Sequence, residues 1–176
     1  MLVDSVGMPL QFANRYAYSM IEKPGKSKSS IRKALYVISR LYLWAEIEGV
    51  NLKQILFYGK FLDSDQISNI VDFIQFTSIT QNMILKAKQK QTDKIIPGRS
   101  NIISFRNTAK IDYSYTSHQV YANRLRILRK FLKWVPLERQ AQRIDTPSVV
   151  MKRSKLAINI IEGNIPLDKT MNSSKR

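Results

Sequence analysis

Cysteine is absent from the 176-residue chain, and histidine occurs once, at His118. The lack of cysteine excludes disulfide bonds, thiolate zinc sites and cysteine nucleophiles, and it fits a cytosolic protein. One histidine has no second His or Cys with which to complete a metal site. The sequence also contains no phosphate-binding GxxxxGKS or GxxxxGKT loop, no dinucleotide-binding GxGxxG and no GxSxG hydrolase turn. We therefore expect no metal, no cofactor and no catalytic residue in this chain.

Long apolar runs are also absent, so we expect no membrane-spanning helix. The first residues, Met1-Leu2-Val3-Asp4, carry an early acid and lead into no apolar segment of the kind found in secretory signals. These features predict a cytoplasmic, nucleoid-associated protein. Neither a membrane nor a small-molecule substrate is expected among its partners.

Acidic residues are scarce. The chain has 13 Asp and Glu against 29 Lys and Arg, which leaves a net charge of +16 and a pI near 10.2. Such a surplus favours a polyanionic partner, because each basic side chain placed on a phosphate releases condensed counterions. A soluble protein that is merely basic remains the alternative interpretation.

Hydrophobic residues make up 44% of the chain and recur at helical spacing, which predicts an all-α fold. One helix is predicted to begin at Ser29 or Ser30 and to end at Gly49, since glycine tolerates the left-handed conformation that follows a helix end. A second is predicted from Asp63, with Gln66 completing a capping box. The connector between them, 50–62, is expected to be irregular.

Two further helices are predicted in the second half of the chain. The first opens at Thr116, with Gln119 at capping-box spacing, and ends at Pro136, because proline cannot continue a helix. The second follows Thr146-Pro147 and stops at Gly163. Most of 79–113 is expected to be a long loop, with a short helix around Met83–Lys90 and an extended piece at Ile102–Phe105.

The domain boundaries follow from these elements. Residues 1–26 show no helical period and are interpreted as an extended N-terminal arm. Residues 27–163 are predicted to form a compact bundle of four or five helices. Residues 164–176 are polar and unpatterned, and we expect a flexible linker or tail there.

The basic residues concentrate on two of the predicted helices. On the helix from Thr116, Arg126, Arg129, Lys130 and Lys133 are spaced at i, i+3, i+4 and i+7 and so share one side. Both helix starts are rich in hydroxyl and basic groups, and free backbone N–H groups there favour phosphate. A basic stripe is also typical of any soluble amphipathic helix, so it is the pair of stripes, with few acids between, that indicates nucleic acid. The residues predicted to contact DNA are Lys26, Lys28, Ser29, Arg32, Lys33, Arg40, Thr116, Ser117, His118, Arg124, Arg126, Arg129, Lys130 and Lys133.

Three segments resemble a known family. They are SSIRKALYVISRLYLWAEIEGVNL at 29–52, FYGKFLDSDQISNIVDFI at 57–74 and SHQVYANRLRILRKFLKWV at 117–135. Their apolar spacing and their Leu-Tyr-x-Trp and Asn-Arg-Leu anchors are similar to the N-terminal core-binding region of tyrosine recombinases, the phage-type integrases. The resemblance covers about residues 9–163.

The resemblance implies a SAM-like helical bundle that forms half of a clamp around double-stranded DNA, where further recombinase protomers would also bind. The family's catalytic set of arginines, lysine, histidine and tyrosine belongs to a separate C-terminal domain. This chain has no HxxR motif, so none of that set carries over. The resemblance therefore implies that this chain is not an enzyme by itself, although a full-length parent would be a strand-exchange enzyme.

Two other functions remain open at this point. A stand-alone regulator would bind the same DNA sites and compete with a complete recombinase. A helical protein-interaction module would instead present the aromatic residues of the predicted arm, Phe12, Tyr16 and Tyr18, to a partner. Tyr113 and Tyr115, just before the third helix, are expected to pack, with stacking on a sugar or base as the alternative.

Overall fold

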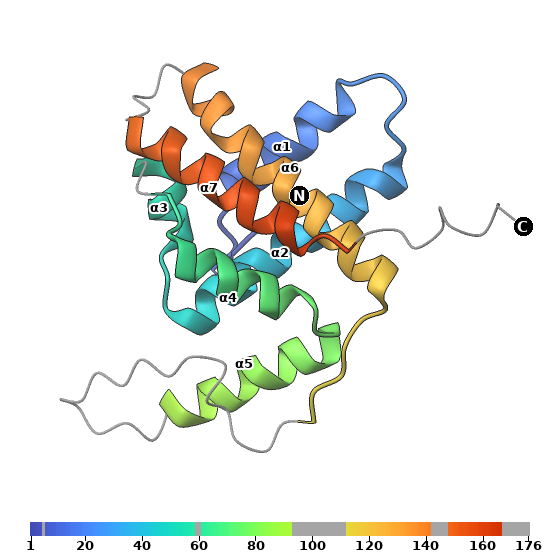
Figure 1. The fold of residues 1–176 in the computed structure, drawn as a ribbon, viewed down its shortest axis with the longest axis vertical. Coiled ribbons are helices and arrows are strands. Elements are labelled where there is room, and N and C mark those ends of the chain that lie inside the picture. The colour runs from blue at the N-terminus through green and yellow to red at the C-terminus, as the bar shows by residue number, and fades with distance from the viewer. Residues whose placement is uncertain (5, 59–60, 93–111, 142–147, 167–176) are drawn as a thin grey trace, which may run out of the picture.

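The computed structural model describes residues 1–4, 6–58, 61–92, 112–141 and 148–166 (Figure 1). Within these ranges the chain is mostly helical and contains no strand longer than an isolated bridge. The helices are α1 (Gln11–Ile21), α2 (Lys28–Glu48), α3 (Leu52–Tyr58), α4 (Ser64–Ile74), α5 (Ser78–Thr92), α6 (His118–Ala141) and α7 (Ser148–Asn164). The all-α prediction is confirmed, whereas the predicted number of four or five helices is too low. None of these helices is long and apolar enough to cross a membrane.

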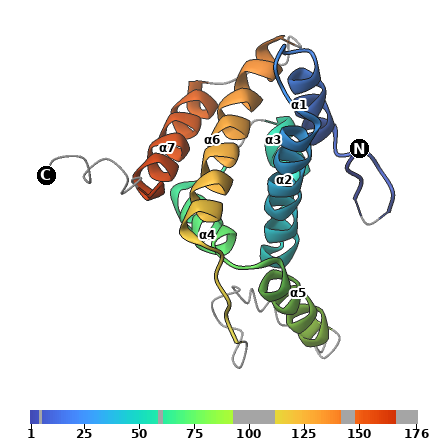
Figure 2. The same cartoon turned by 90° about the vertical axis from the view of Figure 1, so that its right-hand side faces the viewer.

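Figure 2 shows α2 and α6 running side by side, with α7 on the far side of α6 and α5 at one end. The hydrophobic core lies between these helices. Its largest fully buried side chains include Trp44 of α2, Phe73 of α4 and Phe131 of α6. The segment that is strongly basic in sequence, α6, is thus held from two sides by apolar packing.

The two best-patterned helices form as expected. In α2, Ala34, Ile38 and Leu41 of the predicted stripe are buried, and Gly49 ends the helix with φ of +67°. The cap is Ser27 rather than Ser29 or Ser30, since the Ser27 hydroxyl accepts a hydrogen bond from the Ser30 amide at 3.1 Å.

The capping box of α4 is confirmed. The Asp63 carboxylate accepts from the Gln66 amide at 2.8 Å, and the Gln66 side chain accepts from the Asp63 amide at 3.1 Å. Two backbone donors that the first turn leaves unpaired are satisfied in this way.

The extended arm predicted at 1–26 is wrong, because its middle forms α1. Phe12, Ala13 and Tyr16 are buried, and the Tyr16 ring meets Trp134 edge-on at 5.2 Å. An ion pair of 2.6 Å between Arg15 and Glu138 also joins α1 to α6. The start of α1 has no side-chain cap, which removes the usual sequence signal for a helix beginning.

Two predicted loops also contain helices. The connector 50–62 includes α3, whose Leu52 and Leu56 are buried, and the segment predicted as mostly loop includes α5, which extends beyond the short helix expected there. The predicted extended piece at Ile102–Phe105 lies outside the described residues. So do Thr146, Pro147 and the tail from residue 167.

Pro136 does not end α6, which continues to Ala141. Proline lacks the N–H that would donate to the carbonyl four residues earlier, at Leu132. The Ser154 hydroxyl of α7, which is buried, donates to that carbonyl at 3.4 Å instead. A side chain from the neighbouring helix therefore replaces the lost backbone hydrogen bond.

The buried face of α7 is made by Val150, Ala157 and Ile161, whereas Val149 and Leu156 are about half exposed. The helix also runs one residue past Gly163, to Asn164.

Candidate nucleic-acid interface

A groove of about 710 Å³ lies between the middle of α6 and the opposing α1, the α1–α2 connection and the first turns of α2. None of the described residues that line it is acidic. Six of them are cationic, three on each side: Lys23, Lys26 and Lys33 from the first wall, and Arg126, Lys130 and Lys133 from α6. Because the described lining holds six cations and no acidic residue, it favours a positive potential in the groove.

Apolar and aromatic side chains form the floor of this groove. Tyr16 and Trp134 meet there edge-on, and Ala34 and Ile127 continue the surface, whereas Leu137 follows Lys133 by one helical turn and is 52% exposed. Burial raises the pKa of the Tyr16 phenol, so this group stays neutral and adds no negative charge to the lining. The site is thus an apolar trough with a cationic rim.

Helical spacing explains the α6 wall. Arg126, Lys130 and Lys133 follow one another at i, i+4 and i+7, which places them on one face. Leu125, Leu128, Phe131 and Leu132 occupy the opposite side and are fully buried. Apolar packing therefore fixes the direction in which the cations point.

A second hollow, of about 390 Å³, continues the groove along the same pair of helices. The two share Lys33, Asn123 and Ile127, and the second adds Arg32 and Tyr36 of α2. Its described lining also contains no acidic residue. Six of the predicted contact residues with long basic side chains on α2 and α6 therefore border one continuous depression: Arg32, Lys33, Arg124, Arg126, Lys130 and Lys133.

The remaining predicted residues at the helix starts do not line the groove. Lys28 and Ser29 are exposed on the first turn of α2, and His118 is exposed at the start of α6. The Ser117 hydroxyl caps α6 by accepting from the Val120 amide at 3.4 Å, and the Thr116 hydroxyl donates to the Gln75 carbonyl at 3.1 Å. Thr116 is thus a structural residue and is not the predicted cap.

Arg124, which was also predicted to contact DNA, lines the second hollow but is only 8% exposed. Its Nη1 donates to the carbonyls of Ile74 at 2.8 Å and Phe76 at 2.7 Å. The Arg124 guanidinium also lies over the Tyr36 ring, 5.5 Å from the ring centroid, and the Arg40 guanidinium lies 5.1 Å from the same centroid. Burial lowers the pKa of Arg124. The guanidinium thus hydrogen-bonds to backbone carbonyls at and just after the end of α4.

Arg129 also departs from the predicted basic face. It forms an ion pair of 2.7 Å with Glu162 of α7, on the side of α6 away from the groove. The four-residue face expected on α6 is therefore divided, since three members line the groove and the fourth joins two helices.

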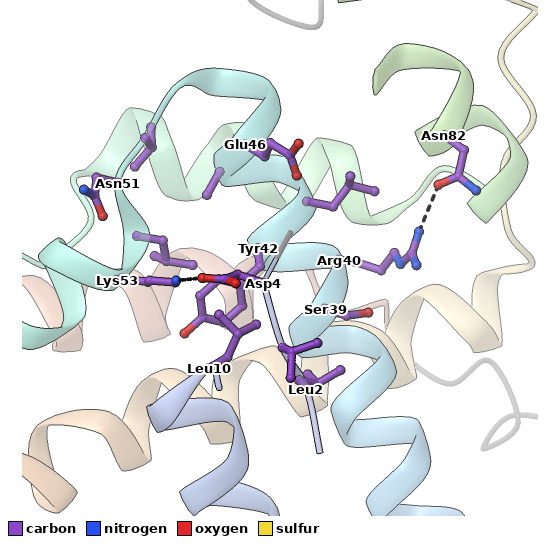
Figure 3. A pocket seen from close by; sticks show the side chains of 15 residues that line it. Leu2, Asp4, Leu10, Ser39, Arg40, Tyr42, Glu46, Asn51, Lys53 and Asn82 are labelled. Carbon is purple, nitrogen blue, oxygen red and sulfur yellow. Dashed lines mark hydrogen bonds and ion pairs between the residues drawn. The ribbon is translucent and has the colours of Figure 1, made fainter. Parts of the chain in front are cut away.

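Arg40 lies in a different pocket, shown in Figure 3. This cavity of about 470 Å³ lies between the N-terminal segment, α2 and α3, and Arg40 donates to Asn82 of α5 at 3.3 Å across its edge. Asp4 and Glu46 line it together with Lys53. Because its charges are mixed, this pocket lacks the uniformly positive potential of the groove.

No protein-family model, curated protein or solved structure matches the chain. In the described ranges there is also no cluster of three His, Cys, Asp or Glu residues that could hold a metal ion.

Sequence reasoning missed Lys23 and Ser30, as well as the apolar floor. Lys23 lies in the segment interpreted as an arm, and the floor exists only because α1 packs beside α6. The helical i, i+4 spacing of Phe12 and Tyr16 was the available signal for α1.

The packing of α1 beside α6 buries Phe12 and Tyr16, so of the three aromatics proposed to dock a partner only Tyr18, 62% exposed, is at the surface. Tyr113 and Tyr115 pack on the Phe76 ring, at 5.2 and 5.3 Å.

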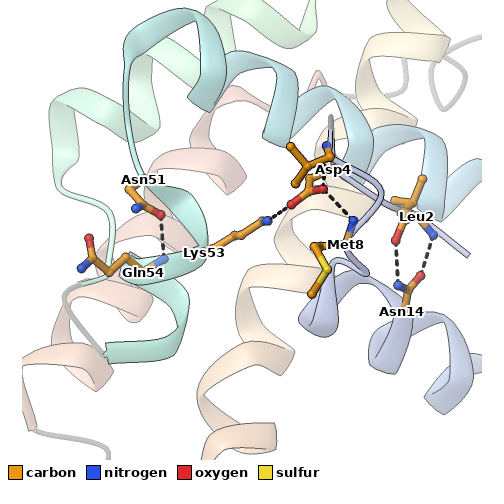
Figure 4. A network of polar contacts seen from close by, with 8 residues as sticks. Leu2, Asp4, Met8, Asn14, Asn51, Lys53 and Gln54 are labelled. Atoms are coloured by element: carbon orange, nitrogen blue, oxygen red, sulfur yellow. Dashed lines mark hydrogen bonds and ion pairs between the residues drawn. The ribbon is translucent and has the colours of Figure 1, made fainter.

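The N-terminal segment is held by a polar network around Asp4 (Figure 4). The carboxylate accepts from the amides of Val6 at 3.0 Å and Met8 at 2.8 Å and pairs with Lys53 of α3. Leu2 and Asn14 exchange two further hydrogen bonds, of 2.7 and 2.8 Å. The network fixes this segment against α1 and α3.

Acid is expected to release this segment. The hydrogen bond from Lys53, followed by those from the backbone, lowers the pKa of Asp4 below its usual 3.8. A lowered carboxyl pKa stabilises the folded form above pH 3.8, and this contribution disappears as the pH falls through the folded-state pKa. The Met8 amide resonance, followed by NMR during acid titration, should shift with a midpoint below 3.8. In an Asp4→Asn variant that transition should be absent, and a midpoint above 3.8 in the unchanged protein would contradict the network.

Proposed function

We propose that this chain is a DNA-binding module without catalytic machinery of its own. The observation that carries the proposal is the groove whose described lining holds six cations and no acid. Two facing rows of lysine and arginine, on α6 and on the start of α2 with the connection before it, suit the sugar–phosphate backbone of a double helix lying across the groove. Lysine-rich contacts of this kind supply affinity through counterion release and carry little sequence information.

We further propose the N-terminal core-binding half of a tyrosine recombinase as its biological setting. The support for this part is the resemblance of segments 29–52, 57–74 and 117–135, which correspond to α2, to α3 with α4, and to α6. A stand-alone regulator that competes at recombination sites would use the same contacts. Reading the gene downstream of codon 176 for an in-frame catalytic domain separates the two settings.

Salt dependence tests the DNA-binding proposal. We expect log K for a labelled duplex, measured by fluorescence anisotropy, to fall linearly with log salt at about −0.9 per phosphate neutralised. In a Lys130→Gln/Lys133→Gln variant the slope should become less steep by about 2, because two phosphate contacts are lost. Affinity that does not change with salt would contradict the proposal.

A matched pair on another surface provides the control. Lys152 and Lys155 are exposed on α7, have the same i, i+3 spacing and do not line the groove. Lys152→Gln/Lys155→Gln removes the same charge and should leave the slope unchanged. Equal changes in both double variants would show that net charge, rather than the groove, determines binding.

A further inference from the structure

The floor of the groove has no function in binding an intact duplex. The flat faces of the bases are stacked inside a double helix, and only the base edges reach the grooves between its sugar–phosphate strands. Duplex phosphates bound at the rim would therefore leave Trp134, Ile127 and Leu137 in contact with water. Leu137 is 52% exposed and Trp134 is half-buried, so apolar surface is accessible between the two rows of cations.

We propose that this groove binds an unpaired stretch of DNA, with bases packed on the Trp134 floor and phosphates on the lysine rim. The inference rests on the proposed function and specifies the form of DNA that the groove itself takes. A positively charged groove that follows the backbone, together with aromatic side chains on which bases stack, is the usual design for binding single strands without sequence preference. Both parts are present here: Trp134 and three of the cations lie on α6, and the other three lie on α2 or in the connection before it.

The size and charge arrangement of the groove favour this occupant. Its volume of about 710 Å³ suits a few nucleotides and is too small to enclose a double helix. Cations line both walls, so the occupant needs negative charge on either side of an aromatic or apolar body. A single strand offers one phosphate for each flat base, whereas a lipid surface would need the cations on a flat or convex face.

The two tryptophans make the groove directly observable. Trp44 is 1% exposed in the core, and its indole Nε1 has no hydrogen-bond partner, so Trp44→Phe removes no polar contact. Trp134 is then the single fluorophore of this type, and it lies in the groove. We expect a dT oligonucleotide of about 12 nucleotides to quench Trp134 emission, in step with the rise in anisotropy of the labelled strand. A hairpin duplex should raise anisotropy with little quenching.

A substitution of Trp134 gives a second readout. Trp134→Leu should weaken dT binding about tenfold, because a base loses its stacking partner, while duplex affinity stays unchanged. Trp134→Phe keeps an aromatic face and should retain most of the dT affinity, which separates stacking from a folding defect. Tyr18→Leu is the control, since Tyr18 is exposed on α1 and does not line the groove.

The outcomes distinguish this inference from the proposed function. Duplex binding without quenching of Trp134 by dT would overturn the inference and leave duplex binding intact. Failure to bind either form of DNA would overturn both. A blue shift of Trp134 emission with vesicles of anionic phospholipid, and no response to dT, would assign the groove to a lipid surface and also overturn the inference.

Discussion

Replacing Arg124 by methionine is expected to lower the free energy of unfolding by about 3 kcal/mol. The guanidinium donates two short hydrogen bonds to the carbonyls of Ile74 and Phe76, at the end of α4. Ile74 is the last residue of α4 and Phe76 lies two residues beyond it, so Arg124 places a cation at a helix C-terminus, where it also interacts favourably with the helix dipole. Methionine fills similar space but leaves both carbonyls without this donor.

Urea denaturation followed by circular dichroism measures this change. Lys130→Met is the matched control, because Lys130 is exposed on the same helix and should change stability by no more than about 0.5 kcal/mol. Under conditions where Arg124→Met remains folded, its affinity for DNA should equal that of the unchanged protein. Reduced DNA affinity with unchanged stability would instead support the contact role predicted from sequence.

Reversing one charge on each wall of the groove, with Lys33→Glu and Lys130→Glu together, should weaken duplex binding about a hundredfold at about 0.1 M salt. Each lysine contributes about one phosphate contact, and a glutamate in its place also repels the backbone. If one DNA backbone contacts both walls, each single variant should lose about tenfold and the effects should add in free energy. Anisotropy titrations of the single and double variants measure these losses.

Lys28→Glu tests whether the groove, rather than the start of α2 in general, binds DNA. Lys28 and Lys33 are both exposed on α2, but only Lys33 lines the groove. The Lys28 variant should therefore lose much less affinity than the Lys33 variant. A loss as large as that of Lys33→Glu would place the contact surface at the helix start, as the sequence alone suggested. Thermal unfolding of every variant should be unchanged, since none of these lysines is buried.

The sequence predicted the helices that carry both a cap and a long apolar stripe. Asp63 with Gln66 marked the beginning of α4, and Gly49 marked the end of α2, because those signals are local. The helix α1 has no side-chain cap, and α3 is too short to show a period. The prediction that Pro136 ends α6 failed for a different reason. The hydroxyl that replaces the lost backbone donor belongs to Ser154, which is distant in sequence.

The candidate site could be predicted only in part for the same reason. Periodicity correctly placed Arg126, Lys130 and Lys133 on one face of α6. It could not separate Arg129 from them, because that distinction depends on Glu162 of α7. Nor could it show that Arg124, two residues before Arg126, turns into the protein toward α4. Tertiary packing decides which cations reach solvent, and local sequence carries little of that information.

The position of Pro136 links helices that are far apart in the chain into one cooperative unit. The Ser154 hydroxyl of α7 donates to the Leu132 carbonyl, which Pro136 leaves without its usual backbone donor. The last turns of α6 carry Arg139, which is buried and donates to the carbonyls of Leu56, at 2.8 Å, and Phe57 in α3. Detachment of α7 would therefore remove the Ser154 donor from the Leu132 carbonyl and loosen the last turns of α6. Arg139 would then lose its hydrogen bonds to α3, so we expect α3, α7 and the end of α6 to unfold together rather than one helix at a time.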